Sequence, residues 1–162
     1  MAAPRTGSSG GLEKRIAEVA ATLNGASVTA GMQGQGGAPG EEDDATLVRI
    51  ARDHEYGIGV PERPFMRGAA KTYGKKWAQG ARQAVSEASQ GNPEQAKATI
   101  RLLGTVMVGD IQESIATGPW KPNSAATVLL KGSSRPLIDT GQMIQSVRAV
   151  LIEPSGKMEL IG

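Results

Sequence analysis

The sequence predicts an α+β fold in which a small antiparallel β-sheet, made of an early strand and a C-terminal hairpin, packs against two long helices, with extended loops. Three observations predict it. Residues 68–90 and 93–117 repeat apolar side chains at helical spacing. Residues 28–32 alternate apolar side chains, as a strand does. Two aliphatic segments near the C-terminus flank a Pro-Ser-Gly-Lys turn, which is typical of a hairpin.

The composition predicts one domain with a thin core. A chain of 162 residues is long enough for one domain but too short for two well-packed ones. It has two Trp, two Tyr and one Phe against 22 Gly, so burial against partner subunits is a plausible source of added stability. We expect a flexible segment at residues 1–11 and a single domain over residues 12–162.

Charge and cysteine content exclude several classes. The absence of Cys excludes disulfides and thiol chemistry and suits a reducing cytosol. No run approaches the ~20 apolar residues of a membrane span, so we expect a soluble protein that has no membrane partner. The net charge of +2, with Lys and Arg scattered among Asp and Glu, gives little support for nucleic acid as the main partner.

The first half of the chain predicts a helix, a strand, a loop and a second helix. Apolar residues at helical spacing from Leu12 to Leu23 predict a helix that ends near Asn24. The strand at 28–32 leads into a flexible Gly-rich and acidic loop at 33–44. The second helix is capped by Asp44, ends at the sequence Gly57–Pro61, and buries one face. That face contains Leu47, Ile50, Ala51 and His54.

The two long helices follow a loop that presents residues 63–67. The first runs from Gly68 to Gln90, and its two glycines permit close approach of a neighbour. Its packed face is predicted to hold Tyr73, Trp77, Ala81, Ala84 and Ala88, with the glycines at Gly74 and Gly80. The second has Asn92 as N-cap, Pro93 at the first position and Gln95 at the capping-box position, and Gly118-Pro119 ends it. Its apolar stripe is Ile100, Leu103, Met107, Ile111 and Ile115.

The last quarter predicts short elements. An extended connection from Trp120 leads to a helical patch over residues 124–130. Asp139 with Gln142 forms a D-x-x-Q cap for a brief turn. Residues 146–153 form a strand, and residues 158–161 return as its hairpin partner.

The sequence offers little for catalysis. His54 is the single histidine, and the zinc motif H-E-x-x-H fails because Ile58 stands where the second ligand would be. A lone His on an apolar helix face is more often structural. No serine lies in G-x-S-x-G. We therefore expect no enzyme, no catalytic residue, no metal and no cofactor.

Glycine and acidic clusters also lack the pattern of a ligand site. The Gly-rich residues 31–40 have no Lys-Ser or Lys-Thr ending, and the acidic residues that follow would repel phosphate. Gly74-Lys75-Lys76 also fails as a P-loop, because Trp77 stands where the motif needs a Ser or Thr hydroxyl to bind magnesium. The consecutive carboxylates Glu41, Glu42, Asp43 and Asp44 lack the alternating spacing of a calcium loop and are more typical of a solvated helix start.

Two segments are candidate interaction sites. In the first, Arg63 and Arg67 flank Pro64, Phe65 and Met66, so the guanidinium groups could contact a partner while Phe65 fills its pocket. The alternative is a loop-to-helix joint that docks Phe65 into the chain's own core. The second segment is Leu137, Ile138, Asp139 and Thr140, where the local pattern is a capped turn with two buried aliphatic residues.

These segments carry a resemblance to a known family. Residues 50–57, the block Val60–Arg67, and Lys131-Gly132 leading to Pro136–Met143 are similar, in the same order, to the neck and tail-completion (virion morphogenesis, head–tail joining) proteins of tailed bacteriophages. These blocks cover about a fifth of the chain. The order of elements agrees over residues 12–162.

The resemblance implies a non-enzymatic structural virion protein, assembled in the host cytoplasm, that forms a ring at the head–tail junction. Its neighbours would be a portal-side connector or head-closure protein and a tail terminator or tail-tube protein. Six-fold symmetry is favoured over twelve-fold. Genomic DNA would pass through the lumen, which the loop residues Glu41, Glu42, Asp43 and Asp44 would face.

Three alternatives stay open at this stage. One is a tail terminator that closes the tail tube, because terminators have a similar small α+β architecture. Another is a small DNA- or RNA-binding accessory protein, supported by a pI near 9.0 and by Lys71, Lys75, Lys76 and Arg82 on one helix. A hydrolase acting through His54 is the third.

Overall fold

The computed structural model describes residues 9–32, 44–132, 134–138 and 140–161. The elements in this part of the chain are α1 (Ser9–Leu23), β1 (Ser27–Met32), α2 (Asp44–Tyr56), α3 (Phe65–Ser89), α4 (Pro93–Thr117), α5 (Ala125–Lys131), α6 (Gln142–Gln145), β2 (Val147–Ile152) and β3 (Met158–Ile161). The predicted loop at 33–44 lies outside the described residues, except that α2 begins at Asp44. Residues 9–11 of the segment predicted to be flexible form the start of α1, and residues 1–8 lie outside the described residues.

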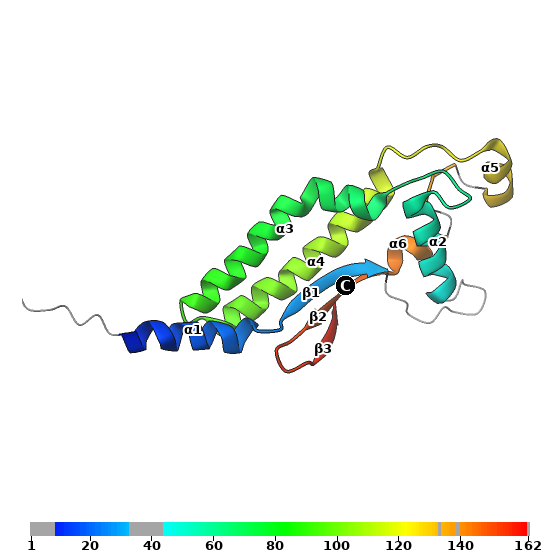
Figure 1. Cartoon of the computed structure of the whole chain (residues 1–162). Coiled ribbons are helices and arrows are strands. Elements are labelled where there is room, and N and C mark those ends of the chain that lie inside the picture. The colour runs from blue at the N-terminus through cyan, green and yellow to red at the C-terminus, as the bar shows by residue number, and fades with distance from the viewer. Residues whose placement is uncertain (1–8, 33–43, 133, 139, 162) are drawn as a thin grey trace, which may run out of the picture.

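The three strands form one antiparallel sheet with the order β1-β2-β3. β1 pairs with β2, Ser27 lying opposite Ile152, and β3 pairs with the other edge of β2, Met158 lying opposite Ile152. The early strand therefore joins a C-terminal hairpin, and the two long helices α3 and α4 pack against this sheet (Figure 1). This confirms the predicted α+β class.

Helix α4 lies along one face of the sheet. Alternate residues of β2 are buried on that face, namely Val147, Ala149 and Leu151. The helix approaches closely at Gly104, where an added Cβ would lie 3.1 Å from both Val28 Cγ2 and Ile161 Cδ1. A larger residue at this position would push α4 away from the strands.

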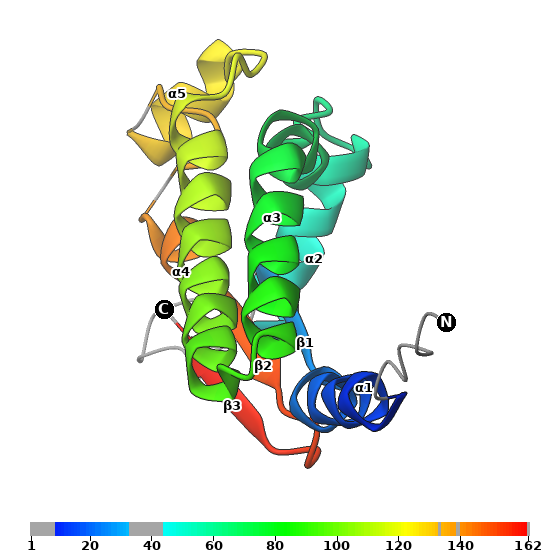
Figure 2. The ribbon, with the colours of Figure 1, turned by 90° about the vertical axis from the view of Figure 1, so that its left-hand side faces the viewer.

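Helix α3 runs beside α4 and is joined to it by a tight turn (Figure 2). An added Cβ at Gly80 would lie 3.2 Å from Leu103 Cδ1, so Gly80 permits the predicted close approach. Gly74 has nothing within 4 Å, so the same prediction was wrong for Gly74. Ala81, placed on the packed face by its spacing, is exposed, whereas Ala84 is buried.

A buried carboxylate links the two long helices. Asp110 of α4 is 6% exposed, and its two oxygens accept hydrogen bonds from Lys76 Nζ and Trp77 Nε1, each at 2.7 Å. Burial of a charged group is tolerated when it is paired and hydrogen-bonded. The stripe predicted for α4 is confirmed at Leu103, Ile111 and Ile115, while Ile100 and Met107 are half-buried.

Of three predicted helix starts, that of α4 is confirmed and the other two need correction. The first long helix begins at Phe65 and not at Gly68. Asn92 occupies the predicted N-cap position of α4, but its side chain makes no capping hydrogen bond. The N-cap of α6 is Gly141, whose φ of 83° suits glycine. Asp139, the predicted cap, lies outside the described residues.

Candidate interaction site

The two segments singled out in the sequence meet at one end of the molecule. The loop that joins α2 to α3, the connection after α4, and the segment before α6 lie together where the long helices end (Figure 1). Hydrogen bonds between residues about 60 positions apart join them. This end, which also carries α5, is the candidate interaction site.

Arg63 is the central link of this end. Arg63 is only 3% exposed. Its Nε and Nη2 atoms donate to the carbonyl oxygen of Lys121, at 3.1 and 2.9 Å. Nη2 also donates to Asn123 Oδ1 at 2.9 Å, and Asn123 Nδ2 donates to the carbonyl oxygen of Arg135 at 3.3 Å. Burial lowers the pKa of the Arg63 guanidinium, which remains charged at any physiological pH. The prediction that this guanidinium contacts a partner is corrected, since it is buried and its donors bond to backbone and side-chain acceptors of the same chain.

His54 belongs to the same network. Arg63 Nη1 lies 3.2 Å from His54 Nδ1, and Arg63 N donates to the carbonyl oxygen of His54 at 2.7 Å. Since a guanidinium can only donate, the first contact assigns the acceptor role to Nδ1. These two contacts join His54 to the loop after α2.

Glu55 anchors the start of α3. It is 5% exposed; Oε2 accepts from Met66 N at 2.9 Å, and Oε1 accepts from Arg67 N and Arg67 Nε, both at 3.0 Å. A carboxylate at this position satisfies backbone donors that the helix cannot satisfy itself and interacts favourably with the helix dipole. The early start of α3 at Phe65 follows from this cap. No local pattern predicts it, because the cap comes from a different helix.

Arg67 lies at the exposed rim of this cap. Besides its contacts with Glu55, its Nη2 donates to Glu62 Oε1 at 2.8 Å, and its guanidinium lies 5.0 Å from the centre of the Tyr56 ring. The hydrogen bonds to Glu55 and then Glu62 raise the pKa of Arg67. Exposed pairs of this kind add little stability. Arg67 is therefore also engaged within the chain.

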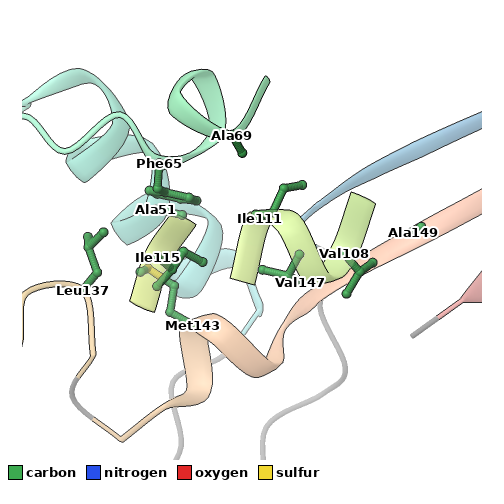
Figure 3. Close-up of a cluster of buried hydrophobic side chains, with 10 residues drawn as sticks. All are labelled: Ala51, Phe65, Ala69, Val108, Ile111, Ile115, Leu137, Met143, Val147 and Ala149. Atoms are coloured by element: carbon green, nitrogen blue, oxygen red, sulfur yellow. The ribbon is translucent and has the colours of Figure 1, made fainter. Parts of the chain in front are cut away.

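Phe65 and Leu137 lie in the chain's own core. Phe65 is 0% exposed, and Figure 3 shows its ring among buried side chains from α2 and α4. Leu137 is also buried, and it has a φ of 63°, a conformation that costs a side-chain-bearing residue roughly 1–2 kcal/mol. The prediction that Phe65 fills a pocket of a partner is thus corrected in favour of the joint.

The other predicted interaction residues are placed differently. Pro64, Met66 and Ile138 are half-buried, and Ile138 packs against the core cluster. Thr140 is exposed, and its Oγ1 accepts from Gln142 N at 3.3 Å. Asp139 lies outside the described residues, as do Glu41, Glu42 and Asp43 of the predicted channel-facing loop.

A shallow cavity of about 360 Å³ opens between the loop after α2 and the start of α5. Its lining is His54, Gly59, Val60, Pro61, Arg63, Asn123, Ser124, Thr127 and Leu137. Ser124 Oγ is occupied with capping α5, and no carboxylate is among the lining residues.

Helix α5 carries two leucines that are exposed to solvent. Ser124 Oγ accepts from Thr127 N at 3.1 Å at its start, and Gly132 with a φ of 68° ends it. Leu129 and Leu130 are 86% and 88% exposed. We call them the α5 pair. The sequence analysis missed it, although two adjacent leucines in a helix of seven residues signal that both cannot point into the core.

A second apolar surface lies on the sheet face that points away from α4. Strand β3 contributes Met158 and Leu160, which are 70% and 51% exposed, and β2 contributes the half-buried Val150 and Ile152. The opposite side of β3 faces α4, where Glu159 binds Arg101 at 2.9 Å. Its hydrogen bond to Arg101 lowers the pKa of Glu159. We call the four apolar residues the outer sheet face.

The described residues hold no group of three or more His, Cys, Asp or Glu that could bind a metal ion. No helix in the described part of the chain is long and apolar enough to cross a bilayer. Comparisons with protein-family models, with curated proteins and with solved structures found no match.

Proposed function

We propose that this chain is a non-enzymatic structural subunit that forms a ring with copies of itself at the head–tail junction of a tailed bacteriophage. The observation that carries the proposal is the presence of two exposed apolar surfaces at different places on the molecule, the α5 pair and the outer sheet face. Exposed apolar residues that gather in one place typically mark contact sites.

Two different surfaces are what a ring requires. In a cyclic ring each copy contacts the copy before it with one surface and the copy after it with another. Figure 1 places α5 beyond one end of the long helices, whereas β3 lies below their middle. Contact between the α5 pair of one copy and the outer sheet face of the next would bury both. Burial of apolar area stabilises association by about 25 cal/mol per Å².

The α5 pair is presented by an ordered support. Arg63 binds the connection that leads into α5, and Asn123 ties this connection to the segment before α6. The blocks that resemble phage neck proteins supply both Arg63 and that segment. A surface held in one shape loses less entropy on binding than a mobile one. This favours an assembly role for the resembling residues, exerted through the support and not through direct contact.

In this proposal the ring contacts a portal-side connector or head-closure protein on one side and a tail terminator or tail-tube protein on the other, and genomic DNA passes through it. The resemblance favours six copies.

The assembly can be tested with the double variant Leu129→Ser, Leu130→Ser. We expect the unaltered chain to form a particle of about six times the 16.8 kDa of one chain, measured by light scattering after size-exclusion chromatography. We expect the variant to remain folded but monomeric, because the contact loses its apolar area. Removing two exposed leucines should leave the free energy of unfolding of the monomer within about 0.5 kcal/mol.

A matched control removes two apolar residues that are exposed elsewhere. Val85 of α3 and Leu102 of α4 are 51% and 64% exposed, and the variant Val85→Ser, Leu102→Ser should still assemble. Equal loss of assembly in both variants, or a ring that survives the loss of the α5 pair, would contradict the proposed contact. A chain that is monomeric at every concentration would contradict self-assembly.

A further inference from the structure

The outward face of α3 carries cations without carboxylates. No Asp or Glu occurs between Glu62 and Glu87, a stretch that includes nearly all of α3. Lys71, Lys75 and Arg82 are exposed. Because a helix turns by about 100° per residue, the three residues lie within about 40° of one another around the helix axis and share one face. We call these three residues the α3 cations.

Within the described part of the chain, the side chains of the α3 cations make no hydrogen bond and no ion pair. The other two cations of α3 are paired, Arg67 with Glu55 and Glu62, and Lys76 with Asp110. The α3 cations can therefore bind a partner, whereas Arg67 and Lys76 already bind carboxylates of the chain itself.

Exposed cations on neighbouring helices behave differently. On α4, Lys97 binds Glu94 at 3.1 Å, and Arg101 binds Glu159 at 2.9 Å. On α2, Arg52 binds Asp53 at 2.8 Å. Surfaces that serve only solubility interleave both signs in this way. Lys71 and Lys75 are instead like charges four positions apart, which disfavours a helix by about 0.2–0.5 kcal/mol.

The geometry of the α3 cations fits a row of phosphates. From residue 71 to residue 82 the helix axis advances by about 16 Å. One strand of duplex DNA carries about five phosphates over that length, so each cation can reach a phosphate without bending the helix. The exposed Thr72 and Gln79 lie beside them and can donate hydrogen bonds to the same backbone.

The aromatic residues of α3 decide between duplex and single-stranded nucleic acid. Trp77 Nε1 donates to Asp110, and Tyr73 is hydrogen-bonded to Glu113, which raises the pKa of Tyr73. Both rings are half-buried and engaged with α4, so they offer no platform on which bases could stack. The face therefore offers charge and polar donors to a duplex backbone, beside the exposed apolar residues Ala78 and Val85.

We propose that the outward face of α3 binds the phosphate backbone of duplex DNA, without sequence preference, through Lys71, Lys75 and Arg82. This goes beyond the assembly proposed above and does not depend on it, because a monomer carries the same face. If the chain does form a ring around DNA, the inference places α3 on its inner side, and several copies would add their contacts. The lumen would then be lined at least in part by cations.

The test measures how strongly the full chain binds a labelled DNA duplex of mixed sequence at different salt concentrations. Fluorescence anisotropy reports the binding, at salt concentrations from about 50 to about 200 mM, a range over which the release of counterions weakens binding to DNA. We expect binding that weakens steeply with salt. In the variant Lys71→Gln, Lys75→Gln, Arg82→Gln, the slope of log K against log salt should fall by about 2 to 3 units, since each phosphate contact contributes about 0.9.

The control variant is Arg49→Gln, Lys121→Gln, Lys157→Gln, which removes the same net charge from exposed residues of other segments. It should keep most of the slope. Both variants should unfold thermally at the temperature of the unaltered chain, which shows that the fold is intact. Equal losses in the two variants, or no binding of the unaltered chain to duplex at the lowest salt, would overturn the inference. Binding that is stronger to single strands than to duplex would also overturn it.

Discussion

The variant Phe65→Ala should lower the free energy of unfolding by about 3–5 kcal/mol. Phe65 is 0% exposed and is the one phenylalanine of the chain. Its ring packs at the junction of α2, α3 and α4, close to Ala51 and Ile115 (Figure 3). Removing it leaves a cavity that the small residues around it cannot fill, so the lost transfer free energy and the lost packing add. Equilibrium unfolding in urea measures the change.

The matched control is Val85→Ala on the same helix. Val85 is 51% exposed, so its truncation should change the free energy of unfolding by less than about 0.5 kcal/mol. If Phe65→Ala were as mild as this control, the ring would not be in the core. It would then be available to a partner, as one of the two sequence-based alternatives had it.

The variant Glu55→Ala should lower the free energy of unfolding by about 2–4 kcal/mol, because it leaves several donors without their acceptor. Glu55 accepts from two backbone N–H groups at the start of α3 and from Arg67 Nε. The carboxylate is nearly inaccessible, so water cannot fully replace it without disturbing the loop. We also expect loss of helical order in the first turn of α3, measured as faster amide hydrogen exchange at Met66 and Arg67.

Two controls separate the cap from simple charge. Glu62→Ala removes a carboxylate that binds the same Arg67 but is 56% exposed, and its effect should stay below about 1 kcal/mol. Glu55→Gln keeps one acceptor oxygen and should lie between Glu55→Ala and the unaltered chain. Equal effects of the Glu55 and Glu62 variants would mean that the backbone cap is not what stabilises this joint.

Local patterns in the sequence were enough for most of the fold. The spacing of apolar residues predicted α4, the alternation of apolar side chains predicted β1, and the turn at Pro154 predicted the hairpin. Each of these patterns depends on residues that are close together in the chain. The start of α3 was misplaced because its cap comes from Glu55 on another helix. Asn92 was placed correctly at the N-cap of α4, but its side chain makes no capping hydrogen bond, because the spacing of residues does not report the backbone angles that such a bond needs.

The candidate site was predictable only in outline. The sequence indicated that residues 54–67 and 135–143 matter, but not that they meet, nor that Arg63 joins them through the carbonyl of Lys121. Contacts between residues so far apart depend on the whole fold. The α3 cations were visible as lysines and an arginine on one helix. Only the structure separates those that stay unpaired from Lys76, which Asp110 neutralises.

In the function we propose, this chain completes the junction between the head and the tail of a phage. The most direct test is electron microscopy of a lysate from a tailed phage that encodes the chain, with this gene disabled and, in parallel, restored from a plasmid. We expect DNA-filled heads and separate tails without the gene, and joined particles when it is restored. Intact, infectious virions in the absence of the gene would contradict the claim.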